Sequence, residues 1–221
     1  MIAKELLTDL IPLVTPSDTG VLVNSWMDTY RVSHLPFSDG EVYTGLITEA
    51  DILNLADPDQ PIGNHLFNLN RVYVFEDQHL FEAVEEIASR RLTLLPVIDR
   101  TQKYLGCITL PDLINHFGAM ISSGQPGAIL VVQMAARDYT LTTLSRIIEE
   151  NQARILNLFL VPVADTGDVR VTMKISTTEI RSIGRSLERY GYQVTGWYLD
   201  NQNLGEFYRE RYEELMKYIN L

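Results

Sequence analysis

The sequence predicts a mixed α/β protein, α+β in arrangement, made of a duplicated unit and a separate C-terminal domain. Three observations lead to this prediction. A strand–turn–strand–helix pattern occurs twice, about 60 residues apart. A stretch rich in Gly, Ser and Pro follows at 118–127, as expected for a linker. Strand and helix patterns then resume in a different order, which indicates a second kind of domain.

The duplication is visible by direct comparison of the two copies. Residues 33–37 recur at 93–97, a shift of 60, and residues 45–53 recur at 106–114, a shift of 61. Each copy is predicted to run strand, helix, strand, turn, strand, helix. A unit of this size buries too little surface alone, so the copies are expected to pack against each other. We assign the first copy to residues 1–57 and the second to 58–118.

Within the second copy, the patterns define each element. A short β-prone run spans 71–75, and a helical pattern begins at Leu80. Strands are expected at 94–98 and 104–108, and the last helix is expected to start at Thr109.

After a linker at 119–127, residues 128–203 have the order βαββαβ, which predicts a ferredoxin-like sandwich. A capping box at 176–179 is expected to open its second helix, and Gly191 to close it. The strands are expected at 128–134, 155–163, 169–175 and 194–199, and the helices at 141–151 and 178–190.

The last segment, residues 204–221, is predicted to be an amphipathic helix. Tyr208, Tyr212, Leu215 and Ile219 fall on one helical stripe. This stripe would take part in a homodimer together with the second domain, because two-fold pairing is the commonest symmetry of soluble oligomers. Folding back onto its own domain is the alternative.

Two motifs resemble known families. The Leu-Pro strand at residues 35–36 and 95–96, followed by Gly-x-x-Thr-x-x-Asp at 45–51 and 106–112, resembles the CBS motif, and two copies resemble a Bateman module. Residues 128–200 resemble an ACT domain by element order and one loop. The whole arrangement is similar to acetoin-utilisation accessory proteins and related CBS–ACT regulatory proteins of bacteria.

The resemblance implies a non-catalytic regulatory sensor that binds AMP, ADP, ATP or S-adenosylmethionine in the cleft between the motifs. Asp51 and Asp112 match the family's ribose-binding aspartate, since a carboxylate can accept hydrogen bonds from both ribose hydroxyls. Thr48 and Thr109, three residues earlier, are placed to reach ribose or phosphate. The alternative is that each Thr-x-x-Asp only caps a helix.

Other side chains complete the expected nucleotide site. Arginines at the end of each copy's first helix are the candidates for phosphate contacts, and apolar strand residues are the candidates for the adenine wall. Phe37, larger than the residue usual in the family, would partly fill the first slot, which favours the second copy. The arginines are Arg31, Arg90 and Arg91, and the apolar residues are Val14, Leu35, Val74 and Leu95.

A possible ligand loop lies in the ACT-like domain at Arg137, Asp138 and Thr140. ACT domains that bind amino acids usually have Gly where this chain has Thr140, because a missing Cβ lets the backbone approach the ligand. The two charges could hold an amino acid, or they could simply be solvated. We therefore expect dimerisation rather than amino-acid binding from this domain.

No catalytic or metal-binding constellation is predicted. The four histidines are scattered, and the single cysteine, Cys107, falls inside a predicted core strand. No required cofactor is expected. Residues 1–118 contain seven Lys and Arg against 17 Asp and Glu, a balance of −10, which disfavours nucleic acid. With no membrane span or secretion signal, a cytoplasmic location is expected, with a regulated enzyme or transporter as a possible partner.

Overall fold

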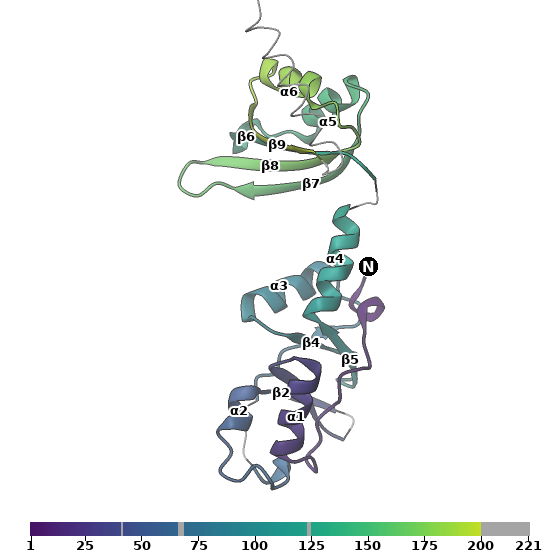
Figure 1. Ribbon diagram of the computed structural model, residues 1–221, viewed down its shortest axis with the longest axis vertical. Helices are drawn as coiled ribbons and strands as arrows, with labels where there is room; N and C mark the ends of the chain where they lie inside the picture. Colours follow the sequence, from purple (N-terminus) through teal and green to yellow (C-terminus); the bar gives the residue numbers. More distant parts are fainter. Residues whose placement is uncertain (41, 66–68, 123–124, 200–221) are drawn as a thin grey trace, which may run out of the picture. The chain divides into compact units, whose positions relative to one another are not determined.

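A computed structural model describes residues 1–40, 42–65, 69–122 and 125–199 (Figure 1). The chain divides into two compact units, Met1–Met120 and the part from Ile121 onward. The described part of the first unit contains the helices α1 (Gly20–Tyr30), α2 (Glu49–Leu53), α3 (Leu80–Arg90) and α4 (Leu110–Ser122), and the strands β1 (His34–Asp39), β2 (Val42–Thr48), β3 (Val74–Phe75), β4 (Leu94–Ile98) and β5 (Tyr104–Thr109).

The two copies of the first unit have the same layout. In each, a helix precedes an antiparallel strand pair, β1–β2 or β4–β5, and a second helix follows. The leading strand is short: β3 pairs in parallel with β4, and its counterpart in the first copy is one parallel bridge from Val14 to Phe37. The run expected as a strand at 71–75 is therefore narrower than predicted.

The copies exchange the segments that precede their leading strands. Thr8 pairs with Cys107 of β5, so residues that precede the leading strand of the first copy extend the sheet of the second. The backbone N–H of Leu46 in β2 donates to the carbonyl of Asn70, so residues that precede the leading strand of the second copy extend the sheet of the first. This exchange joins the copies into one unit with a shared core.

The motif glycines are explained by this exchange. A Cβ on Gly45 would lie 2.7 Å from Cβ of Leu69, because the crossing segment passes directly over the strand. At Gly106 a Cβ would lie 3.2 Å from the Leu7 side chain, and the backbone has a φ of +145°. Glycine is required at both positions so that the exchanged segment can lie against the strand.

Helix α4 continues through Ser122, so it extends into the segment expected as a linker from residue 119. The Gly-rich composition of 118–127 therefore marks the boundary between the units only approximately. Gly118 in α4 has open space around the position of a Cβ. Glycine lowers helix propensity without preventing a helix, which explains this difference.

The second unit has the predicted ferredoxin-like order. Its four strands form one antiparallel sheet in the order β7-β8-β6-β9, and both helices lie on one face of that sheet (Figure 1). A separate core lies between the helices and the sheet. The elements are β6 (Ala128–Ala135), α5 (Leu141–Glu150), β7 (Ile155–Pro162), β8 (Asp168–Ile175), α6 (Ile180–Arg189) and β9 (Gln193–Leu199).

The predicted capping box at 176–179 is wrong. Helix α6 begins at Ile180, and its N-cap residue Glu179 makes no side-chain cap. The hydroxyl of Ser176 instead accepts a hydrogen bond from the backbone N–H of Arg154, 2.9 Å away. This tertiary contact uses the hydroxyl that the sequence pattern predicted as the helix cap. The C-terminal prediction is confirmed, since Gly191 has a φ of +81°.

Candidate functional site

The two Thr-x-x-Asp motifs form the same structure at the starts of α2 and α4. In the first copy, the backbone N–H of Asp51 donates to the Thr48 hydroxyl at 3.2 Å, and that hydroxyl donates to Asp51 Oδ2 at 2.7 Å. In the second copy, the corresponding distances are 3.2 Å and 2.6 Å between Thr109 and Asp112. The helix-capping alternative is therefore realised in both copies.

Capping leaves part of each carboxylate for other partners. All the hydrogen bonds that Asp51 and Asp112 accept from the threonines end on Oδ2. Oδ1 of each aspartate accepts no hydrogen bond from the part of the chain that the structure describes, and both side chains are only half-buried. A ligand hydroxyl could therefore donate to Oδ1 without breaking the cap.

The two motif helices begin next to a junction between the copies. The backbone N–H of Ser33 donates to the hydroxyl of Thr93 at 3.1 Å, which links the start of β1 to the start of β4. The first N–H of each motif helix donates to the same pair of residues: Glu49 to the carbonyl of Ser33, and Leu110 to that of Thr93. The repeat thus brings both sequence-predicted motifs to one place.

His34 lies at this junction and breaks its symmetry, because the second copy has Leu94 at the same position. Its Nδ1 lies 3.0 Å from the Thr93 hydroxyl and 3.4 Å from the Thr93 backbone N–H, which donates to it. Burial of the ring lowers the pKa of His34 below its ordinary value, and the negative charge of Asp51 opposes that shift. This contact could not be predicted from local sequence patterns, because the partners are 59 residues apart.

The four apolar residues expected to wedge adenine lie in the core. Val14, Leu35, Val74 and Leu95 are each at most 1% exposed and belong to one hydrophobic cluster. Phe37 is also buried there. An adenine ring could reach these side chains only if the surrounding core residues moved, so the described conformation has a closed core at this place.

The three arginines lie at the helix ends where the sequence placed them. Arg31 and Arg91 follow the last residues of α1 and α3, and both have left-handed backbone, with φ of 53° and 55°. Arg90 is paired with Glu86 at 2.7 Å on the surface. Arg31 lines a shallow hollow of about 370 Å³ together with the acidic residues Asp28 and Glu49.

Sequence reasoning missed the turn that starts each copy's first helix. In the first copy, Oδ2 of Asp18 accepts from the backbone N–H of Thr15 at 2.7 Å. In the second, Oε1 of Gln78 accepts from the N–H of Phe75 at 2.6 Å. The two pairs occupy equivalent positions, 60 residues apart, so the repeat could have predicted this turn. It was missed because the accepting residue is Asp in one copy and Gln in the other.

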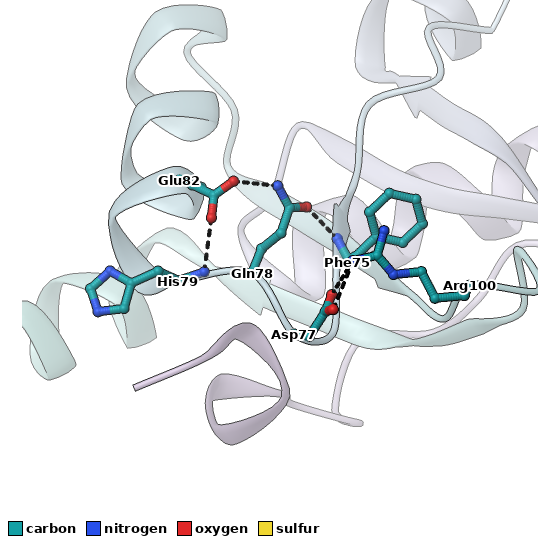
Figure 2. A network of polar contacts seen from close by, with 6 residues as sticks. All are labelled: Phe75, Asp77, Gln78, His79, Glu82 and Arg100. Atoms are coloured by element: carbon teal, nitrogen blue, oxygen red, sulfur yellow. Dashed lines mark hydrogen bonds and ion pairs between the residues drawn. The ribbon is translucent and has the colours of Figure 1, made fainter.

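Figure 2 shows how the second copy extends this turn. The other end of Gln78 donates to Glu82 at 2.5 Å, and the second Glu82 oxygen accepts from the N–H of His79. Arg100 donates twice to Asp77, at 2.7 and 2.9 Å, and this pairing holds the pKa of the Asp77 carboxyl below its ordinary value. The network ties the turn before α3 to the turn between β4 and β5.

In the loop suggested as an ACT ligand site, the two charged side chains are exposed to solvent. Arg137 and Asp138 are exposed and lie 3.8 Å from each other. Thr140 has an ordinary φ of −137°, and its hydroxyl donates to Thr143. The backbone conformation of Thr140 is therefore unstrained, and its Cβ remains the obstacle to close approach of a ligand. Amino-acid binding here stays a hypothesis.

Cys107 is a core residue, as the sequence indicated. It is fully buried in β5, and burial raises the pKa of its thiol to about 11. Within the described ranges, no group of three His, Cys, Asp or Glu residues could hold a metal ion. None of the helices in these ranges has the length and apolarity that crossing a membrane requires.

A comparison with known families agrees with the geometry of the second copy. Residues 66–119 match the family model of the CBS domain. This segment is similar to the CBS domain. The first copy has the same layout, so the fold of the first unit agrees with the CBS domain pair that the repeat predicted.

Two curated relatives share this module. The chain is similar to inosine-5'-monophosphate dehydrogenase of Methanocaldococcus jannaschii, 32% identical over 116 residues, which are 52% of this chain and 23% of that protein. The dehydrogenase of Rhodopirellula baltica is 32% identical over 88 residues, 39% of this chain and 16% of that protein. The chain thus spans less than a quarter of the length of either dehydrogenase.

Among solved structures, a CBS domain pair/ACT domain protein from Thermotoga maritima has a TM-score of 0.49 at 23% identity, over 55% of this chain and 100% of that one. The CBSX2 protein in complex with AMP has a TM-score of 0.47 at 18% identity, over 54% and 98%. The ACT resemblance of the second unit, the homodimer and the link to acetoin utilisation stay predictions, and the helix expected at 204–221 lies outside the described residues.

Proposed function

We propose that the CBS pair is a non-catalytic sensor of an adenosine-containing ligand: AMP, ADP, ATP or S-adenosylmethionine. One observation supports this most directly. In both copies, beside the junction of the copies, Oδ2 of the aspartate accepts a hydrogen bond from the threonine hydroxyl that caps the helix, while Oδ1 has no partner in the described part of the chain. Two neighbouring ribose hydroxyls are donors that suit such an oxygen.

Binding is favoured in the second copy. Helix α4 has 13 residues and α2 only five, so α4 presents the stronger positive end to a phosphate. Arg31 in the first copy shares its hollow with Asp28 and Glu49, whose negative charge opposes a phosphate. Asp112 would therefore hold the ribose, with Arg91 as the nearest candidate for phosphate.

The ligand would act by shifting a conformational equilibrium. Because Val74 and Leu95 are buried, the adenine ring needs an arrangement in which the core opens at the junction. A ligand that binds only the open arrangement increases its population in proportion to its affinity. An enzyme or transporter that contacts the module would respond to this change.

A thermal-shift screen tests the proposal. A ligand present at 100 times its dissociation constant stabilises the folded state by about 2.7 kcal/mol, so the melting temperature should rise measurably. The screen contains AMP, ADP, ATP with and without Mg²⁺, and S-adenosylmethionine. If none of them raises the melting temperature at millimolar concentration, the sensor is rejected in favour of a scaffold with degenerate sites.

A matched pair of variants separates binding from capping. We expect Asp112→Ala to weaken ligand affinity by about 1.5–3 kcal/mol, and to lower the free energy of unfolding by about 1 kcal/mol because the Thr109 hydroxyl that caps the helix loses the carboxylate to which it donates. Asp18→Ala also removes a carboxylate that caps a turn, but away from the motif, so it should lower stability and leave affinity unchanged. Equal affinities of both variants, measured by calorimetry, would leave capping as the only role of Asp112.

A further inference from the structure

The sheet of the second unit has an exposed apolar face opposite its helices. Leu130, Val171 and other buried residues point toward α5 and α6, which cover that side (Figure 1). The alternate residues of the four strands therefore point the other way. Among them are the apolar side chains of Ile129, Val131, Phe159, Val161 and Tyr198.

The strand register places these side chains in a continuous band. Tyr198 pairs with Ile129, and Val131 lies two residues along the same strand. Phe159 and Val131 both pair with Thr172 of β8, from opposite sides. Four of the five are well exposed, including Val161 at 55% and Tyr198 at 62%. Contiguous apolar surface of this kind marks an interaction site.

The net charge that β8 contributes to this face is positive. Arg170 and Lys174 lie on it, on either side of Thr172, and Asp168, which accepts a hydrogen bond from Gln133, supplies one negative charge. Two copies packed through this face would bring cations against cations, which disfavours a second copy as the occupant.

We propose that residues 204–221 of the same chain cover this face. They follow β9, an edge strand of the sheet, after the short polar stretch 200–203. Residues 200–221 contain five Asp and Glu against three Lys and Arg, and the sequence predicts one apolar stripe along a helix. The sequence alone left this stripe two destinations, its own domain or a second copy, and the exposed band favours the first.

The dimensions agree with this placement. A helix of 18 residues would be about 27 Å long at 1.5 Å per residue. Four strands about 4.8 Å apart span about 14 Å, so the helix can cross the whole sheet. Its stripe, Tyr208, Tyr212, Leu215 and Ile219, would lie on the band, and its glutamates would face away from the sheet.

Cysteine labelling tests the proposal. Ile129→Cys and Val161→Cys place thiols on the band, and Leu160→Cys places one on the opposite face of the same strand as Val161, where Leu160 is 41% exposed. The native Cys107 is buried and gives little background. Each variant is labelled with a maleimide in the full chain and in a chain ending at Asn203.

We expect truncation to speed labelling of the two band cysteines by about tenfold or more, because a covering segment protects them. Labelling of Leu160→Cys should not change. Equal rates for the band cysteines in both chains would overturn the proposal. A protection that disappears on dilution would also overturn it, because it would show that the covering segment comes from another molecule.

Substitutions within the full chain give an independent readout that does not depend on truncation. Leu215→Lys puts a charge on the stripe and should raise labelling of Val161→Cys to the rate of the truncated chain. Glu213→Lys changes a residue on the other side of the predicted helix and should leave the band protected. If both substitutions have the same effect on labelling, the stripe does not contact the sheet.

Discussion

The two CBS copies share a backbone plan but differ in the residues at their junction. At equivalent positions, the first copy has His34 and Phe37 where the second has Leu94 and Val97. The first copy ends in the five-residue α2 and the second in the 13-residue α4. The two copies therefore have the same fold but differ in the side chains at the junction and in the length of the helix that follows it.

The largest loss of stability should follow truncation of the buried leucines at equivalent strand positions, Leu35 and Leu95. Both are fully buried, so Leu35→Ala and Leu95→Ala should each lower the free energy of unfolding by about 2–5 kcal/mol without ligand. Urea denaturation measures this. A loss below about 1 kcal/mol in either copy would show that its leucine lines an open slot rather than the core.

Substitution of the motif glycines by alanine should lower the free energy of unfolding by a smaller amount, and for a different physical reason in each copy. Gly45→Ala should destabilise by about 1–3 kcal/mol, because its Cβ would meet Cβ of Leu69 at 2.7 Å. Gly106→Ala should cost a similar amount mainly through its φ of +145°.

Double-mutant cycles distinguish these causes. Leu69→Gly removes the clashing atom, so it should couple favourably to Gly45→Ala. Leu7→Ala should couple only weakly to Gly106→Ala, because backbone strain remains. Equal coupling in the two cycles would mean that the glycines act in the same way.

The smallest effect should be a pH dependence that only the first copy supplies. Because the pKa of His34 is lowered in the folded protein, the unfolded chain binds more protons near pH 6.5. The stability that neutral His34 contributes is complete above the unfolded pKa and falls as pH drops toward the folded one. His34→Leu, which copies the second repeat, should flatten the stability profile between about pH 7 and pH 5. An unchanged profile would show that other groups control it.

The sequence predicted elements whose patterns are local. The strand β4 was placed at its observed bounds, because five apolar residues between polar turns allow few alternatives. The motif helices and the βαββαβ order were predicted for the same reason. Elements that depend on distant partners were missed, including the exchanged residues Thr8 and Asn70, whose hydrogen-bond partners lie in the other copy.

The sequence predicted the local geometry of the motif, because the cap itself requires the spacing of Thr109 and Asp112. The role of these two residues in ligand binding stays a prediction. Apolar patterns cannot distinguish the wall of a slot from the core, so Val74 and Leu95 were assigned to a surface that the structure closes. The contact of His34 with Thr93 could not be found without the packing of the two copies.

The exchange of segments between the copies also has a consequence for synthesis on the ribosome. Thr8 pairs with Cys107, which is translated about a hundred residues later. The nascent chain must keep this early segment unpaired, or hold it in temporary contacts, while the whole first copy emerges. The long sequence separation slows closure of the second sheet, so the module is expected to fold as one cooperative event near the end of its translation.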